Sequence, residues 1–323
     1  MLAFDSEYAP AMASLSILEG LPNGYFVDES PRGILAISVS IARAAHEAGF
    51  GPDQDGPLEL SDLSGRKPLY QMELDGERFV VRRYNRGGLF RWFFPQTSLD
   101  PERPFRELVL ADSLARSGIR TPEVVAARAV RWGSGKAVSA FTPGWRLELV
   151  SRRIASSVDY GVVLEELRAG KVGPAARIRL LRSAGAMVRS MHSVGFQHSD
   201  LNPRNLLVRR DALSNAIPEP WIIDLDSSVF MENLSDSDRQ RNLRRLFRAV
   251  QRREKRGKPF FSRADYAHFL RGYDPDRRCW KAYWRQIALG HSRGSLLHLA
   301  GWALERIFGG GAETRDGRAV VRH

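Results

Sequence analysis

One stretch, residues 198–226, constrains the fold of this chain more than any other. It begins with His-Ser-Asp-Leu-Asn-Pro-Arg-Asn and continues into the apolar run Leu206–Val208. A turn at Pro218–Pro220 then leads to a second short apolar run, which ends at Asp224. The succession of polar loop, short strand, turn, short strand and terminal carboxylate is more specific than any of its parts. It predicts a loop and a strand end that together present two carboxylates and an amide.

Asp200 and Asn205 have the spacing of the kinase catalytic loop, H-x-D-L-x-x-x-N. In that pattern the carboxylate orients an attacking hydroxyl, and the amide and a strand-borne Asp hold a metal ion against the nucleotide phosphates. We therefore predict Asp200, Asn205 and Asp224 as catalytic residues, with Asn205 and Asp224 as Mg²⁺ ligands and ATP as the nucleotide. His198 is expected to brace the loop from beneath. The alternative is ordinary loop chemistry, in which Asp and Asn side chains form turns and caps.

The surrounding strand and helix signals predict an α+β protein with a protein-kinase-like, two-lobe fold. The smaller lobe, residues 56–150, is expected to be an antiparallel sheet with one helix, and the larger lobe, residues 151–308, to be mostly helical. Residues 1–55 are expected to form an N-terminal extension, in which the apolar spacing of residues 31–50 predicts a helix. Residues 309–323 are expected to be a disordered tail.

Nucleotide-binding residues are expected in the smaller lobe. A hairpin is predicted over residues 68–84, with its turn at Asp75–Gly76. Val80 and Arg82 share one face of the second strand, which offers an apolar contact to the base and a cation to the phosphates. Ahead of the hairpin, Gly65 marks the position of a phosphate-covering loop, although this segment has a single glycine.

Two helices are predicted from the spacing of their apolar residues. The first covers residues 104–117, ends before Gly118, and carries Glu107 beside its apolar face. Glu107 is expected to pair with Arg82, and the alternative is a solvated surface carboxylate. The second helix covers residues 174–193 and ends shortly before the catalytic loop.

Charge and cysteine content indicate the compartment and the kind of partner that the protein has. The chain has 323 residues, a formal net charge of +12 and a single cysteine, Cys279, which is typical of a reducing compartment. No signal peptide and no membrane-spanning apolar run are evident. Residues 239–258 hold ten Lys or Arg and one acid, with apolar residues at helical spacing. This basic helix suits an anionic membrane surface or nucleic acid, or else it packs on the core with a solvated basic face.

Four segments together resemble the bacterial lipopolysaccharide-core kinases. They are residues 81–89, 105–107, 198–205 and 223–226, and the likeness extends over about residues 60–290. The resemblance implies a kinase that uses ATP to phosphorylate a hydroxyl of the sugar 3-deoxy-D-manno-octulosonic acid (Kdo) on a lipid A precursor. It also implies a cytoplasmic enzyme attached peripherally to the inner membrane. Arg at the position of Arg82 is usual in that family.

Other readings of the chain remain open at this point. A kinase of another core sugar such as heptose, or of a small alcohol, has the same catalytic loop. A catalytically silent kinase-like binding protein is the alternative outside the enzymes, and nucleic-acid binding by the basic helix is not favoured. For contact with an anionic membrane or with the lipid acceptor, residues 82–94 are the preferred segment, because aromatic side chains beside arginine suit the headgroup level. The residues concerned are Arg86, Arg91, Trp92 and Phe93.

Overall fold

The computed structural model describes residues 15–63, 68–84, 98–131, 144–214, 216–254, 261–276 and 283–284. Residues up to Asp276 belong to one compact unit, and residues 277–323 to a second. Within the second unit the structure describes only Tyr283 and Trp284, which are helical. The fold and the site below therefore concern the first unit.

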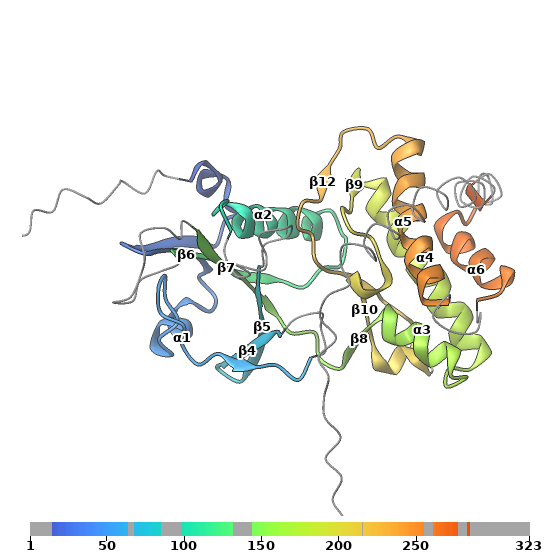
Figure 1. The fold of residues 1–323 in the computed structure, drawn as a ribbon, viewed down its shortest axis with the longest axis horizontal. Helices are drawn as coiled ribbons and strands as arrows, with labels where there is room; N and C mark the ends of the chain where they lie inside the picture. The colour runs from blue at the N-terminus through green and yellow to red at the C-terminus, as the bar shows by residue number, and fades with distance from the viewer. Residues whose placement is uncertain are drawn as a thin grey trace, which may run out of the picture. The chain divides into compact units, whose positions relative to one another are not determined.

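A seven-stranded sheet forms the N-terminal part of this unit (Figure 1). The strand order is β1-β2-β6-β7-β5-β4-β3, and every neighbouring pair is antiparallel. The predicted hairpin is present as β4 and β5, which a left-handed Asp75 and Gly76 connect. The strands are β1 (Tyr25–Ser30), β2 (Gly33–Ser38), β3 (Glu59–Leu60), β4 (Tyr70–Leu74), β5 (Glu77–Arg83), β6 (Val124–Arg131) and β7 (Trp145–Arg152).

The helix predicted over residues 104–117 is present as α2 (Arg103–Arg116). It lies across β6 and β7, and its apolar face, which includes Phe105, Leu108 and Leu114, is fully buried (Figure 1). Gly118 follows the helix with φ +78°, a backbone conformation that suits glycine at the end of a helix. This packing places Glu107 inside the protein, on the side of α2 that faces the sheet.

The helix predicted over residues 31–50 is wrong. The structure has strand β2 at Gly33–Ser38, followed by the short helix α1 (Ala42–Glu47). All six residues of β2 are buried, and the strand lies between β1 and β6 in the sheet. A continuous apolar run of this length fits a buried strand as well as a helix, so periodicity alone does not separate them. The sheet therefore extends into the expected N-terminal extension.

A buried ion cluster ties the segment before β3 to the sheet. Arg128 on β6 lies directly opposite Glu148 on β7, and both side chains have no exposed surface. The Arg128 guanidinium binds Glu148, Asp55 and the backbone carbonyl oxygen of Gly51. Arg83 on β5 donates to the same Glu148 at 2.8 Å. Because an unpaired buried charge is costly, this cluster holds residues 51–55 on the sheet and gives Arg83 a structural partner.

The C-terminal part of the unit is mostly helical. The helix predicted over residues 174–193 is present as α4, which packs closely on α6. A Cβ atom at Gly185 of α4 or at Gly272 of α6 would lie 2.0 Å from a backbone carbonyl oxygen of the other helix, so only glycine permits this approach. The helices are α3 (Tyr160–Arg168), α4 (Pro174–Ser193), α5 (Asp236–Glu254) and α6 (Arg263–Tyr273), with 3₁₀ turns at Ser16–Gly20, Pro203–Asn205 and Arg210–Leu213.

Two small sheets complete this part and carry the catalytic-loop region. One has the strand order β11-β10-β8, and the other pairs β12 with β9. Their strands are β8 (Ser157–Asp159), β9 (Phe196–Gln197), β10 (Leu206–Arg209), β11 (Trp221–Ile222) and β12 (Val229–Phe230). An antiparallel sheet with one long helix, followed by a helical part that holds the catalytic loop, is the predicted α+β, protein-kinase-like two-lobe fold. That prediction is confirmed.

Helix α5 is amphipathic, as the sequence predicts. Leu243, Leu246, Phe247 and Val250 are buried, and the Phe247 ring packs edge-on against Phe269 of α6. The basic residues of α5 thus lie on a helix whose apolar face belongs to the core. Within the described residues no helix is both long and apolar enough to cross a membrane.

Candidate active site

His198 supports the loop that carries Asp200. Its imidazole is fully buried; Nδ1 accepts a hydrogen bond from the Asp200 backbone N–H at 3.0 Å, and Nε2 lies 3.0 Å from the Ile223 carbonyl oxygen. Burial lowers the pKa of His198, so the ring is neutral, with the proton on Nε2. One side chain therefore joins the catalytic loop to the residue before Asp224, in the bracing position that the sequence analysis expected.

Two amides shape the loop around Asp200. The side-chain nitrogens of Asn202 and Asn205 both donate to the Asp200 carbonyl oxygen at 2.9 Å. The backbone carbonyl oxygen of Asn205 accepts a hydrogen bond from the Ile223 N–H at 3.0 Å, which holds the loop beside the Asp224 segment. The Asp200 carboxylate itself is half exposed. The loop thus fixes the backbone of Asp200 and leaves its side chain accessible.

Asp224 follows β11 in a left-handed backbone conformation, with φ +62°. Few residues other than glycine adopt this conformation, and those that do are concentrated at functional sites. The Asp224 carboxylate is partly exposed and accepts a hydrogen bond from Arg82. Its position next to the catalytic loop agrees with the sequence pattern that singled it out.

Arg82 and Glu107 form the ion pair that the sequence analysis expected. The Arg82 guanidinium donates through one terminal nitrogen to Glu107 and through the other to Asp224. Glu107 is almost fully buried and also accepts from the Tyr84 hydroxyl at 2.5 Å and from the Leu225 N–H at 3.1 Å. Burial alone lowers the pKa of Arg82, but Glu107 and Asp224 raise it well above the ordinary value. Glu107 therefore joins β5 and α2 to the segment that carries Asp224.

A second arginine connects α2 to the same segment. Arg103, at the start of α2, donates through two nitrogens to the two carboxylate oxygens of Asp226. Burial raises the pKa of Asp226, but the hydrogen bonds from Arg103 bring it below its usual value. A cavity of about 460 Å³ opens beside this pair, between α2 and residues 226–229. The segment after Asp224 is thus held against α2 at both Glu107 and Arg103.

Helices α4, α5 and α6 meet behind the catalytic loop at His192. This buried imidazole lies 2.8 Å from the Tyr273 hydroxyl through Nδ1 and 3.2 Å from the Asn242 amide oxygen through Nε2. The Asn242 amide nitrogen donates to the His198 carbonyl oxygen at 2.7 Å. Burial lowers the pKa of His192 to about 4, so the ring is neutral at physiological pH. The network sets the position of α5 relative to the catalytic loop.

The family to which this chain belongs follows from comparison with known proteins. Residues 60–273 match the model of the lipopolysaccharide kinase (Kdo/WaaP) family, and these residues hold both Arg82 and the whole catalytic loop. The chain belongs to this lipopolysaccharide kinase family. As a member it is a phosphotransferase of the lipopolysaccharide kinase type, which confirms the resemblance stated above.

Several known proteins are similar to this chain. A 3-deoxy-D-manno-octulosonic acid kinase of Vibrio vulnificus (strain YJ016) is 28% identical over 222 residues, covering 67% of this chain and 83% of the relative. The kinase of the same name from Vibrio parahaemolyticus is 30% identical over 193 residues, covering 58% and 71%. The solved structure "WaaP in complex with acyl carrier protein" is 20% identical, with a TM-score of 0.49 over 73% of this chain and 88% of that one.

The structure of this lipopolysaccharide kinase brings five of the predicted site residues together. Asp200, Asn205, Asp224, Arg82 and Glu107 are linked by the contacts described above. Val80 is half-buried on β5, two residues before Arg82 and so on the same face of the strand. The remaining predicted residues lie outside the described part of the chain: Gly65, Arg86, Arg91, Trp92 and Phe93, together with the tail 309–323.

Sequence reasoning did not assign roles to Tyr84, Arg103 and Asp226. Tyr84 stands two residues after Arg82, so strand alternation places it on the same face and offered a signal. Arg103 and Asp226 are 123 residues apart, and no local pattern relates them. The Tyr84–Glu107 and Arg103–Asp226 pairs both help to hold the Asp224 segment against α2.

Proposed function

We propose that this family member transfers the γ-phosphate of ATP to a hydroxyl of the Kdo sugar on a lipid A precursor. The observation that carries the kinase chemistry is the Arg82 guanidinium, which contacts Glu107 and Asp224 at once beside the Asp200 loop. The Kdo acceptor is supported by the relatives named above, which are called 3-deoxy-D-manno-octulosonic acid kinases.

The proposed reaction uses the accessible carboxylate of Asp200. The sugar hydroxyl lies against this carboxylate, its oxygen attacks the γ-phosphorus, and the bond from that phosphorus to the ADP oxygen breaks. The proton of the hydroxyl passes to Asp200, which is the role of a general base. Because the Asp200 backbone is held by His198 and Asn205, the carboxylate is positioned before the acceptor arrives.

Asn205 and Asp224 would hold the Mg²⁺ ion. They offer an amide oxygen and a carboxylate, and Mg²⁺ prefers such hard oxygen ligands. Asn205 suits this role because its amide nitrogen already donates to the Asp200 carbonyl, which leaves the oxygen for the cation. A Mg²⁺ ion held there would supply neutralisation of charge on the transferred phosphate.

Phosphate transfer tests this function directly. The purified protein is incubated with ATP, Mg²⁺ and a Kdo-bearing lipid A precursor, and the product is analysed by mass spectrometry. We expect one added phosphate on the Kdo residue, and none with Asp224→Ala, because that variant loses a proposed metal ligand. Phosphorylation only of a heptose-bearing acceptor, or of a small alcohol, would replace the Kdo assignment. ATP turnover with no acceptor phosphorylated, or no turnover at all, contradicts the proposal.

We also propose that the enzyme works while attached to the anionic cytoplasmic surface of the inner membrane. Its acceptor is a glycolipid, and each Lys or Arg near an anionic leaflet contributes about 1 kcal/mol of attraction. The contact is assigned to Arg86, Arg91, Trp92 and Phe93, because aromatic residues beside arginine suit the headgroup region. This assignment rests on the sequence alone.

Co-sedimentation with vesicles measures this attachment. We expect binding to anionic vesicles that falls steeply with salt and weakens in Trp92→Ser/Phe93→Ser. The control is Ile217→Ser, which removes a side chain that is 82% exposed outside the assigned segment. Equal binding to neutral vesicles, or equal loss in the control, is the result that contradicts the assignment.

A further inference from the structure

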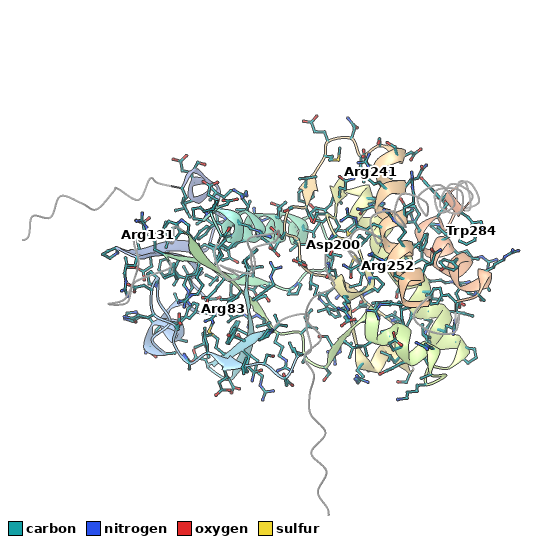
Figure 2. All side chains as sticks on the ribbon, in the orientation of Figure 1. Arg83, Arg131, Asp200, Arg241, Arg252 and Trp284 are labelled. Carbon is teal, nitrogen blue, oxygen red and sulfur yellow. The ribbon has the colours of Figure 1, made fainter. Side chains whose placement is uncertain are left out.

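The exposed face of α5 carries only arginine over three turns. From residue 241 to residue 253, the exposed residues are Arg241, Arg245, Arg248 and Arg252, and no other residue type is exposed there. Their spacing of four, three and four places all four on one face of the helix. Figure 2 labels Asp200 beside α5, together with Arg241 and Arg252 towards its two ends. This row of four residues is called the arginine stripe below.

Arg245 brings the arginine stripe to the catalytic loop. One turn earlier, the buried Asn242 donates to the His198 carbonyl oxygen, and Arg245 donates to the carbonyl oxygen of the next residue, Ser199. A terminal nitrogen of the Arg245 guanidinium lies 3.6 Å from a carboxylate oxygen of Asp200. Both side chains are about half exposed. The stripe is therefore anchored at the carboxylate where the acceptor hydroxyl reacts and extends from there along α5.

Within the arginine stripe, Arg248 lies among like charges. The pKa of Arg248 is lowered by partial burial, and further by the positive charges of Arg245, Arg252 and Arg244. Residues 239–253 contain no acidic side chain. Arg241 pairs with Asp238 at the start of the helix, and Arg245 approaches Asp200. An anion bound along this face would reduce the repulsion between the arginines, so the charge pattern favours an anionic ligand.

We propose that the arginine stripe binds the anionic groups of the acceptor, and that Arg245 binds the carboxylate of the sugar acid whose hydroxyl is phosphorylated. This inference rests on the function proposed above. A reacting hydroxyl must lie within hydrogen-bond distance of Asp200, so a carboxylate on the same sugar falls within reach of Arg245. A guanidinium binds a carboxylate through two parallel hydrogen bonds, which orients the sugar as well as holding it.

The length of the stripe indicates more than one anionic group on the acceptor. Arg252 lies eleven positions after Arg241, so the stripe spans roughly 16 Å along the helix axis. This span exceeds what one carboxylate requires. Arg248 and Arg252 are therefore assigned to charged groups that lie further along the acceptor than the reacting sugar. The stripe is a specificity determinant for the acceptor, separate from the nucleotide-binding residues on β5.

The test varies the arginine and the acceptor charge together. Steady-state kinetics are measured for the wild-type protein and Arg245→Gln, with a Kdo-bearing lipid A precursor and with its methyl ester at the Kdo carboxylate. We expect the wild-type protein to prefer the free acid. In Arg245→Gln, KM for the free acid rises about 10- to 100-fold, the loss expected for a charged hydrogen-bonded contact, while KM for the ester and for ATP stay unchanged. Arg245→Lys should recover part of the preference.

The outer part of the stripe has its own variant and matched control. Arg248→Gln/Arg252→Gln should raise the acceptor KM several-fold and weaken its dependence on salt. The control, Arg43→Gln/Arg78→Gln, also removes two positive charges, from side chains that are 90% and 65% exposed on α1 and β5. The control should behave as wild type. Melting temperatures show whether all variants remain folded.

Three outcomes would contradict the proposal that the arginine stripe binds the acceptor. An unchanged acceptor KM in both stripe variants, a raised KM for ATP instead, or an equal effect in the Arg43→Gln/Arg78→Gln control would remove the arginine stripe from acceptor binding. If the wild-type protein phosphorylates no core-sugar acceptor, the proposed function fails separately. Equilibrium titration of the same free acid and ester into ATP-free protein then tests whether the arginine stripe binds the acceptor. Equal affinity for the acid and the ester would contradict the role proposed for Arg245.

Discussion

Replacement of Asp200 by alanine is expected to lower kcat by at least about 100-fold, the usual scale for losing a positioned acid or base. Nucleotide binding and the melting temperature should change little. The reason lies in the division of roles within Asp200, whose backbone N–H and carbonyl oxygen make most of its hydrogen bonds, to the side chains of His198, Asn202 and Asn205. The carboxylate is half exposed and accepts from Asn202 at 3.1 Å. Removing it therefore removes chemistry more than structure.

A matched control distinguishes this effect from general damage to the loops of the larger lobe. Asp211 lies in the 3₁₀ turn after β10, and its carboxylate is about as exposed as that of Asp200. Asp211→Ala should retain wild-type kcat. Single-turnover assays at saturating nucleotide separate the chemical step from product release. Near wild-type turnover of Asp200→Ala would contradict the assignment of Asp200 as the base.

Replacement of Arg82 by lysine is expected to lower kcat/KM by about 10- to 100-fold although the positive charge is kept. Two nitrogens of one planar guanidinium bind two carboxylates, Glu107 and Asp224. A lysine ammonium is a single nitrogen and does not reproduce this fork. Asp224 and the Glu107 side chain should therefore lose their common link. ATP titrations under steady-state conditions measure the loss.

Arg83→Lys is the natural comparison, because Arg83 is the next residue of the same strand. Its guanidinium binds the buried Glu148 and stacks on the Tyr70 ring, within the ion cluster that holds residues 51–55. We expect Arg83→Lys to keep its activity and to lower the melting temperature. Full activity of Arg82→Lys together with an inactive Arg83→Lys would show that the opposite face of β5 serves the nucleotide.

The parts of the fold that were predicted correctly depend on local patterns. The helix at α4 follows from apolar spacing between Pro174 and Ser193, and its end follows from the nearby Gly195, which has φ +76°. The β4–β5 hairpin follows from its Asp-Gly turn. In the catalytic loop, Asp200 and Asn205 are only five residues apart, so their relation is also local. Such patterns arise from residues close together in the chain, so a short window of sequence is enough to predict them.

The error at residues 31–50 has both a local and a non-local cause. The apolar residues of β2 are spaced in a way that a helix also permits, and the strand pairs with the adjacent β1 as well as with the distant β6. Ile34 of β2 is the partner of Ala129 of β6, far along the chain. No short window of sequence contains both partners. Tertiary context therefore contributes to the choice of strand over helix for this segment.

By itself, the sequence predicted the catalytic loop, the strand-borne Asp224, Arg82 as the cation on β5, and the amphipathic nature of α5. Only the tertiary structure shows which partners Arg82 and its neighbour Arg83 have. Arg82 reaches Asp224 across 142 residues of sequence, whereas its neighbour turns to the buried Glu148. Similarly, only the fold brings Arg245 to the catalytic loop. Spacing along a chain sets which side chains share a face, but the packing of distant segments selects the partners that each face meets.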